Sequence, residues 1–218
     1  MLGPLLLSFQ VSLIATAAAT LVGVALAGLL SRKRFPGSQL LDALLNAPLV
    51  LPPTVLGYYL LVLLGRETTL GRVYESVTGS SIVFTRTGAI CAAALAALPF
   101  VVRSARAALE SLEARFGEAA ATLGASPLRA FWRVELPLAS RGILAGVTLG
   151  FARSLGEFGV TLMVAGNIPE RTQTASLAIY DAVQAGRDVD AAGLAAILTA
   201  LAVLALYAIN KLALAPSR

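Results

Sequence analysis

Five long apolar runs constrain the fold of this chain more than any other feature. They lie near residues 8–30, 41–64, 88–108, 140–165 and 190–213. A helix needs about 20 mostly apolar residues to cross the hydrocarbon core of a bilayer. Because no water satisfies backbone groups there, a spanning segment has to be a helix or part of a closed barrel. The sequence therefore predicts an all-α membrane protein, a polytopic bundle with about five transmembrane helices.

The composition agrees with a lipid bilayer as the main environment. Hydrophobic residues make up 57% of the chain and charged residues 13%, whereas about a quarter of the residues of a soluble domain are charged. The 218 residues show no shift in composition that would mark a second domain, so we expect a single transmembrane domain over residues 1–218. One cysteine, Cys91, and no histidine leave no intramolecular disulfide and no His/Cys metal site.

Basic residues fall unevenly between the segments that connect the runs, and positive charge collects on the cytoplasmic side of membrane proteins. Eleven of the seventeen lie on one side of five crossings: Arg32, Lys33, Arg34, Arg103, Arg106, Arg115, Arg129, Arg133, Arg141, Lys211 and Arg218. Five lie on the other: Arg66, Arg72, Arg86, Arg171 and Arg187. We therefore expect a multi-pass protein of the cell inner membrane with its N-terminus extracytoplasmic and its C-terminus cytoplasmic. The net charge of +5 then reflects topology rather than nucleic-acid binding.

The first run contains Ala25-Leu26-Ala27, which has the form of a signal-peptide cleavage site. A signal peptide carries a basic region before a short apolar core. Here the first ten residues are uncharged, and the basic cluster at 32–34 follows the run. We expect an uncleaved membrane helix.

Prolines interrupt the second run at Pro48, Pro52 and Pro53, and Thr54 follows them. A proline inside a helix removes one backbone hydrogen bond and clashes with the preceding turn. The freed carbonyls need partners from neighbouring helices, hydroxyl groups or water. A static kink and a hinge or break that lines a pathway are both open interpretations. Pro52, Pro53 and Thr54 are therefore candidate pathway or gate residues.

The fourth run carries small residues at every fourth position, namely Gly142, Gly146, Gly150 and Ser154. Such a stripe lets a second helix backbone approach closely, so it predicts a packing seam. Arg153 and Glu157 lie four residues apart in the same run, on one helical face. Charges at this depth are costly and do not face lipid. An internal ion pair that fixes the helix rotation and a border of an anion route, with Arg153 attracting the anion, are both open.

The segment 165–189 follows the fourth run. Gly166, Asn167 and Pro169 end the helix, and residues 175–185 can form an amphipathic helix, with an apolar set of Leu177, Ile179, Tyr180 and Val183. It is either a loop that covers the bundle or an outer gate and docking surface.

A polar segment at about 110–138 separates the third and fourth runs, and part of it reads EAAATLGASPLRAFWRVELP. Apolar residues at helical spacing predict short amphipathic helices: Phe116, Ala119, Ala120 and Leu123, then Leu128, Phe131 and Trp132. Gly124 suits the exit of the first helix, and Pro127 suits the first turn of the next. Its charges, Glu118 among them, would orient a protein partner, although a helix lying on lipid headgroups fits the pattern equally well.

The spacing Glu118-Ala119-Ala120, then Gly124, then Val134-x-Leu136-Pro137 resembles the EAA loop of permease subunits of binding-protein-dependent ABC importers. That pattern carries Ile where this chain has Val134, another β-branched apolar residue. The resemblance implies that Glu118, Ala119, Ala120, Gly124 and Pro137 are coupling positions against a cytoplasmic ABC ATPase dimer.

The resemblance covers nearly the whole chain. PLVLPPTVLGYYLL at 48–61 and RSLGEFGVTLMVAGNIPERTQTASLAIY at 153–180 are similar to molybdate-importer permeases. LGEFG followed by AGNIP is shared in outline with sulfate, thiosulfate and tungstate permeases. The resemblance implies a homodimer, an extracytoplasmic substrate-binding protein, and an anion pathway along the dimer axis with alternating access. ATP and Mg²⁺ would bind in the partner ATPase, because this chain has no G-x-x-x-x-G-K-[ST] phosphate loop and no cofactor of its own.

Two other classes of protein remain open from the residues alone. A gradient-driven secondary transporter tends to show internal repeats, and we find no convincing repeat. A membrane-embedded enzyme needs clustered catalytic groups at depth, where this chain offers Arg153 and Glu157. We therefore expect a non-catalytic permease subunit.

Overall fold

The structure is a computed structural model that describes residues 2–32, 36–112, 116, 122 and 124–214. These residues form helices and connecting segments, with no strand among them. The helices follow in the order α1 (Leu2–Arg32), α2 (Ser38–Val50), α3 (Pro53–Leu64), α4 (Thr69–Thr78), α5 (Arg86–Glu110), α7 (Pro127–Ala130), the π-helix η1 (Phe131–Glu135), α8 (Leu136–Leu155), α9 (Gly159–Ala165), α10 (Ala175–Gln184) and α11 (Asp188–Leu214). The predicted all-α fold is confirmed.

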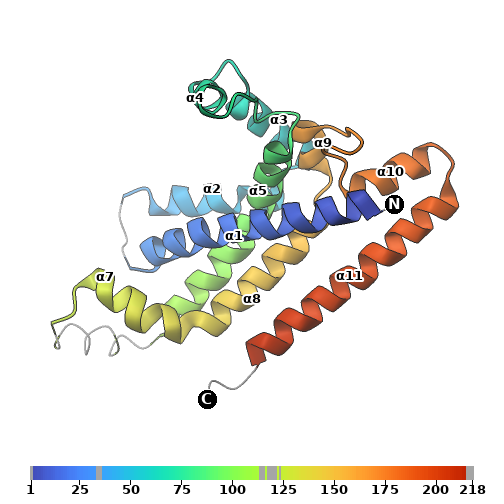
Figure 1. Cartoon of the computed structure of the whole chain (residues 1–218). Helices are drawn as coiled ribbons and strands as arrows, with labels where there is room; N and C mark the ends of the chain where they lie inside the picture. Colours follow the sequence, from blue (N-terminus) through green and yellow to red (C-terminus); the bar gives the residue numbers. More distant parts are fainter. Residues whose placement is uncertain (1, 33–35, 113–115, 117–121, 123, 215–218) are drawn as a thin grey trace.

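Four helical segments of the described chain are long and apolar enough to cross a bilayer: Leu2–Ser31, Arg86–Glu110, Pro127–Leu155 and Asp188–Ile209. They run between an end of the bundle that carries α7 and an opposite end that carries α4 and α10 (Figure 1). The N-terminus lies beside α10, and α11 runs from that end toward the other. The start of α1 and the end of α11 therefore lie at opposite ends of the bundle (Figure 1).

Small side chains let α1, α5 and α8 pack closely in the centre of the bundle. A Cβ on Gly142 would lie 2.5 Å from the Cβ of Ala108, and one on Gly146 would lie 2.6 Å from the Cβ of Ser104. In lipid, where apolar side chains gain little from burial, such close packing is a main source of helix association. The predicted glycine seam on α8 is confirmed, and its partner is α5.

The second apolar run forms two helices, α2 and α3, instead of one. α2 ends at Val50, and Leu51 has extended backbone angles (φ −71°, ψ 141°). A residue before proline is pushed out of the helical region, and the consecutive Pro52 and Pro53 remove two N–H donors. Pro48, in contrast, lies inside α2 without ending it. With about 1.5 Å of rise per residue, neither helix alone spans about 30 Å of hydrocarbon.

The fourth run is also divided. α8 ends at Leu155, and α9 begins at Gly159 after a short break. The helix expected over 140–165 is therefore a long helix followed by a short one. The first break falls at the paired prolines, and the second falls at Glu157, which lies between α8 and α9.

The predicted amphipathic helix at 175–185 is found as α10, although its buried side differs from the expected set. Leu177 is fully buried, while Tyr180 and Val183 are exposed. The buried positions are otherwise alanines: Ala175, Ala178 and Ala182. The backbone N–H of Ala175 donates to the Ser8 hydroxyl of α1 at 2.7 Å. Small residues that allow a close approach to α1 and α11 thus decide which face is buried, rather than the largest apolar side chains.

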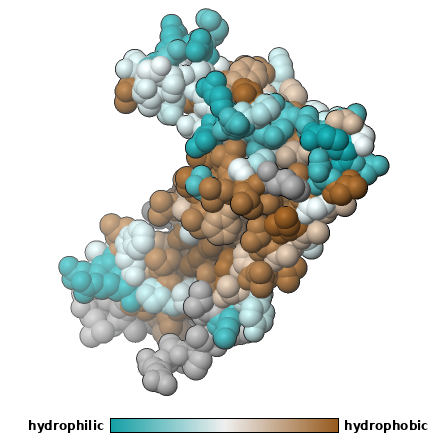
Figure 2. Space-filling model, turned by 45° about the vertical axis from the view of Figure 1, so that its right-hand side comes forward, coloured by the Kyte–Doolittle hydropathy of each residue, from teal (hydrophilic) through white to brown (hydrophobic). Residues whose placement is uncertain are grey.

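The surface shows the layering that a membrane protein needs. On the face in Figure 2, hydrophobic residues cover the middle, and hydrophilic residues gather toward its two ends. Large apolar side chains such as Leu13, Leu21 and Leu204 are exposed along the long helices. In lipid such exposure carries no penalty, so these positions need no protein partner.

Candidate functional site

The two helix breaks meet at the contact between α3 and α9. A Cβ on Gly159 would lie 2.5 Å from the Cβ of Pro53, and one on Gly57 would lie 2.6 Å from the Cβ of Met163. Neither glycine leaves room for a methyl group. The start of each short helix is therefore fixed by direct packing against the other.

An ion pair lies at the end of α8, beside this contact. Nη1 of Arg153 is 2.7 Å from Oε2 of Glu157, and 35% of the Arg153 side chain is accessible against 2% for Glu157. The ion pair, one of the two interpretations left open by the sequence, is present in the structure. A buried carboxylate without a charged partner is costly, and the guanidinium of Arg153 supplies that partner here.

The second carboxylate oxygen of Glu157 holds the next helix. Oε1 accepts the backbone N–H of Val160 at 2.8 Å, which satisfies one of the donors that the first turn of α9 leaves without a helical acceptor. One side chain thus connects α8, through Arg153, to α9. The guanidinium keeps accessible surface and carries five N–H donors, so it can contact a second anionic group.

The structure brings Pro53 close to this pair through Gly159, while its neighbours have other surroundings. Pro52 precedes α3 in extended conformation, and both Pro52 and Thr54 are exposed. Within the described residues, the hydroxyl of Thr54 donates to none of the carbonyls freed by the break. The hydroxyl group nearest to the paired prolines is therefore not the partner of those carbonyls.

Sequence reasoning did not single out Gly57, Gly159 or Met163. Gly57 is buried on the side of α3 that faces α9, and its signal is a lone glycine inside an apolar run, which often marks a close approach. The long-range pairing of Gly57 with Met163 has no local signature.

The polar loop is described in part. Glu118, Ala119 and Ala120 lie outside the described residues. Gly124 has φ +78°, a conformation that glycine adopts without strain. Ser126 accepts the N–H of Arg129 at its side chain, and Pro127 opens α7. The turn at Gly124 and the helix that begins at Pro127 are found as predicted. Of the apolar positions of the amphipathic helix predicted before Gly124, Ala119, Ala120 and Leu123 lie outside the described residues.

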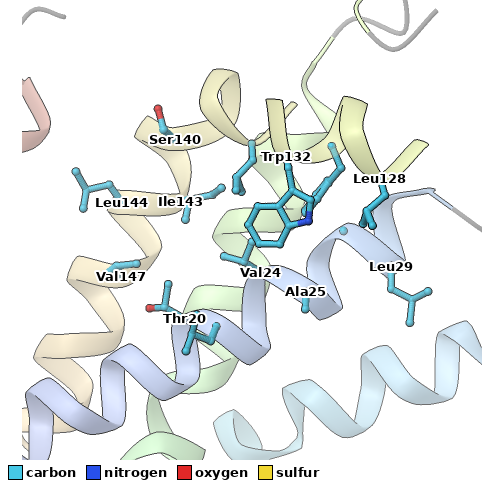
Figure 3. Close-up of a pocket in the computed structure, with 14 residues that line it drawn as sticks. Thr20, Val24, Ala25, Leu29, Leu128, Trp132, Ser140, Ile143, Leu144 and Val147 are labelled. Atoms are coloured by element: carbon cyan, nitrogen blue, oxygen red, sulfur yellow. The ribbon is translucent and has the colours of Figure 1, made fainter. Parts of the chain in front are cut away.

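Phe131 anchors the second half of this loop to the bundle. It is buried together with Val24, Ala27, Val101, Ala105, Leu109 and Ala139. Its ring lies against α1 so closely that a Cβ on Gly28 would be 2.8 Å from its Cε2. Leu128 and Trp132, which were expected on the same apolar face, are 67% and 58% exposed. They line an apolar groove of about 760 Å³ between α1 and α8, in which the Trp132 indole stands between Val24 of α1 and the start of α8 (Figure 3).

The π-helix η1 has a local cause in Pro137. This residue lies in the first turn of α8 and is exposed. Proline lacks the N–H that would bond four residues back and clashes with that carbonyl. A local π turn adjusts the backbone bonds around such a site. Pro137 therefore shapes the join between the loop and α8.

A family comparison places this chain among transport proteins. The family described as binding-protein-dependent transport system inner membrane component matches residues 19–217. The chain belongs to this family. The resemblance seen in the EAA-like pattern is confirmed, and the pattern lies within the matched region.

Two individual relatives show which kinds of transport protein this chain is similar to. The chain is 44% identical over 202 residues to the molybdenum transport system permease protein ModB of Escherichia coli K12, covering 92% of this chain and 88% of that one. It is 38% identical over 209 residues to the sulfate transport system permease protein CysT of Salmonella typhimurium, covering 94% of this chain and 75% of that one. Both are permease subunits, as expected.

The fold of this family member also matches a solved structure. A structure described as inward facing conformations of the MetNI methionine ABC transporter superposes with a TM-score of 0.76 at 18% identity, covering 99% of this chain and 95% of that chain. At that identity the likeness concerns the fold. As a member of the binding-protein-dependent family, the chain is a multi-pass inner-membrane permease subunit that works with a binding protein and a separate ATPase, and it is not itself an enzyme.

Proposed function

We propose that this chain is the membrane subunit of an ATP-driven importer of an oxyanion, and that the oxyanion is molybdate. The observation that carries the proposal is the 44% identity to a molybdenum permease over 92% of the chain. Tungstate, sulfate and thiosulfate are the alternatives, since a sulfate permease is 38% identical over a similar length.

Arg153 gives the proposal a physical basis. Oxyanions bind guanidinium groups through short charge-assisted hydrogen bonds, and Arg153 keeps a third of its side chain accessible. An intramembrane arginine does not face lipid, so the accessible side faces water or protein. We assign Pro52, Pro53, Thr54, Arg153 and Glu157 to the border of the anion route or to its gate.

A second copy of the chain would complete that route. Exposed positions on α8 recur along one stripe, at Arg141, Ala145 and Leu149, and they lead toward Arg153. A face with a charge at membrane depth needs cover that lipid does not supply. We propose a homodimer whose pathway runs between the two copies, each forming one transmembrane domain over residues 1–218.

We infer an orientation with the N-terminus outside and the C-terminus in the cytoplasm. The excess of basic residues in the segments predicted to be cytoplasmic, eleven against five, supports it. In this orientation the loop that contains Glu118 faces the cytoplasmic ATPase, and α10 faces the binding protein.

We propose alternating access as the mechanism. ATP binding would close the ATPase dimer and bring together the two loops that contain Glu118, Ala119, Ala120 and Gly124. Because Phe131 ties the loop to α1 and α5, the bundle would move with the loop and open outward, and hydrolysis would reset it. Pro137 belongs to this unit as the join to α8.

We assign α10 and its flanks to an outer gate and docking surface. α10 presents the exposed residues Tyr180 and Val183 beside its buried alanines. Deletion of residues 173–184 should abolish stimulation of ATP hydrolysis by the binding protein. Unchanged stimulation would refute the docking role.

The substrate assignment is tested by ATP hydrolysis of the reconstituted complex with its binding protein. Molybdate and tungstate, but not sulfate, should stimulate hydrolysis. Stimulation by sulfate alone would preserve the permease assignment and overturn molybdate. Anion uptake without ATP would instead indicate a gradient-driven secondary transporter.

A further inference from the structure

Helix α2 is held in the bundle by few contacts. None of its residues is fully buried, and its main neighbour is α5. Gly37, with φ +91°, precedes it, and the extended Leu51 follows it. α2 is thus a short helix with a break in the helical backbone at each end, and its position depends mainly on its contact with α5.

Arg106 of α5 makes that interaction and a second one at the same time. Its Nη1 lies 2.9 Å from Oδ1 of Asp42 on α2, and its Nε lies 2.7 Å from Oε1 of Glu110. A planar guanidinium can serve two carboxylates in fixed directions, which a lysine ammonium cannot do equally well. The arrangement links α2 to the last residue of α5.

Asn46 keeps Asp42 in place for this contact. Its Nδ2 donates to the backbone carbonyl of Asp42 at 2.7 Å, with Oδ1 of Asp42 at 3.4 Å. The carboxylate therefore meets Arg106 within a polar cluster and not as a lone surface charge.

Glu110 lies where α5 leads into the polar loop. Leu109, its neighbour, is buried in the same cluster as Phe131, which anchors the far side of the loop. The two ends of the loop therefore share one packed base, and Arg106 ties α2 to that base. At its other end α2 leads through Leu51 to Pro53, the residue packed against Gly159.

We propose that Arg106 is a positioning residue for energy coupling, which makes α2 follow the base of the loop and so transmits loop movement to the α3–α9 contact. The proposal rests on the proposed function, in which the loop receives movement from the ATPase. Arg106 contacts neither the anion nor ATP in this role.

The exposure of these ion pairs predicts that their removal affects energy coupling more than the stability of the fold. All three side chains are between a third and a half accessible, and accessible ion pairs contribute little to stability. Removing the bridge should therefore leave a folded complex in which ATP hydrolysis is retained and α2 no longer moves with the loop.

The test measures ATP hydrolysed per anion imported, in liposomes that contain the full complex with its binding protein, ATP and molybdate. Arg106→Gln and Asp42→Asn should each raise this ratio several-fold, and Arg106→Lys should give an intermediate value. Arg103→Gln is the matched control, because Arg103 is an exposed arginine one turn away on α5 that makes no ion pair within the described residues. An unchanged ratio in both Arg106→Gln and Asp42→Asn would overturn the proposal.

A second experiment measures the distance between α2 and the base of the loop. A purely structural role of Arg106 would not make this distance depend on nucleotide. Spin labels at Gln39→Cys and Ser111→Cys, in a Cys91→Ala background, report the separation of α2 from the base of the loop. The separation should stay constant between nucleotide-free and nucleotide-trapped complexes, and should vary with nucleotide once Arg106→Gln is added. If the separation stays constant in that variant, Arg106 does not couple α2 to the loop. A wild-type complex without anion-stimulated ATP hydrolysis would refute the proposed function itself.

Discussion

Glu157 is almost fully buried, and the guanidinium of Arg153, four residues earlier, is its only ion-pair partner within the described residues, at 2.7 Å. The same carboxylate accepts the N–H of Val160. The carboxylate of Glu157 therefore connects the two helices on either side of the break, α8 and α9. This break is also in contact, through Gly159, with the break between α2 and α3.

Replacing the Glu157 carboxylate by an amide should separate its ion pair with Arg153 from its hydrogen bond with Val160. Glu157→Gln keeps an oxygen for the Val160 N–H but removes the negative charge, so Arg153 loses its partner. The Val160 N–H would then donate to a neutral amide oxygen instead of a carboxylate. Hydrogen bonds to charged groups contribute about 1.5–3 kcal/mol, and we expect the free energy of unfolding to fall by no more than this amount, with reduced uptake. Thermal unfolding in detergent and liposome uptake measure the two effects.

A double-mutant cycle with Arg153→Gln gives the control for that experiment. If the residues act as a pair, the double variant should lose less stability than the sum of the two single variants. Additive losses would show that each residue contributes through other contacts.

The contact between α3 and α9 should tolerate no added methyl group. In Gly159→Ala the new Cβ would meet the rigid Pro53 ring at 2.5 Å, and overpacking typically costs about 1–3 kcal/mol. We expect a lower unfolding temperature and slower uptake. Gly3→Ala is the matched control, since no atom lies within 4 Å of a Cβ at Gly3. Equal behaviour of the two variants would show that the contact yields without cost.

The sequence predicted those features that depend on local chemistry. The apolar runs, the glycine seam on α8, the pairing of Arg153 with Glu157, and the turn at Gly124 follow from spacing and from the conformational limits of single residues. The structure confirms the glycine seam and the turn at Gly124, and it contains the ion pair, because neighbours three or four residues apart on a helix meet whatever surrounds them. The second and fourth apolar runs, however, each form two helices instead of one.

The remaining features depend on contacts that are distant in sequence. Pro48 continues a helix and Pro52 ends one, because two consecutive prolines remove two donors at one point. The meeting of Pro53 with Gly159, and of Asp42 with Arg106, joins residues more than sixty positions apart. Periodicity within one segment carries no information about such pairs.

Gly124 provides a test of the loop assignment. Gly124→Trp places a large side chain on a residue at φ +78°, where L-residues are strained by roughly 1–2 kcal/mol. We expect loss of ATP-driven uptake and weakened assembly with the ATPase, measured by copurification. Gly79→Trp is the control, because Gly79 has φ +70° and equally open surroundings at the other end of the bundle. Unaffected uptake and assembly in Gly124→Trp would refute the role of the loop.

Phe131 should contribute far more to stability and to energy coupling than its neighbour Trp132, although both are aromatic and their ring centroids are 5.6 Å apart. Phe131 fills the space between α1 and α5, so Phe131→Ala leaves a cavity and should cost about 3–5 kcal/mol. Trp132 is 58% exposed on the apolar groove, and Trp132→Ala should cost much less. Because Phe131 is the anchor that links loop and bundle, Phe131→Ala should also raise the ATP hydrolysed per anion imported in the complexes that still assemble. Similar unfolding temperatures and similar coupling ratios in the two variants would show that the loop moves the bundle through some other contact, and the most direct remaining route is the continuous chain from Pro137 into α8.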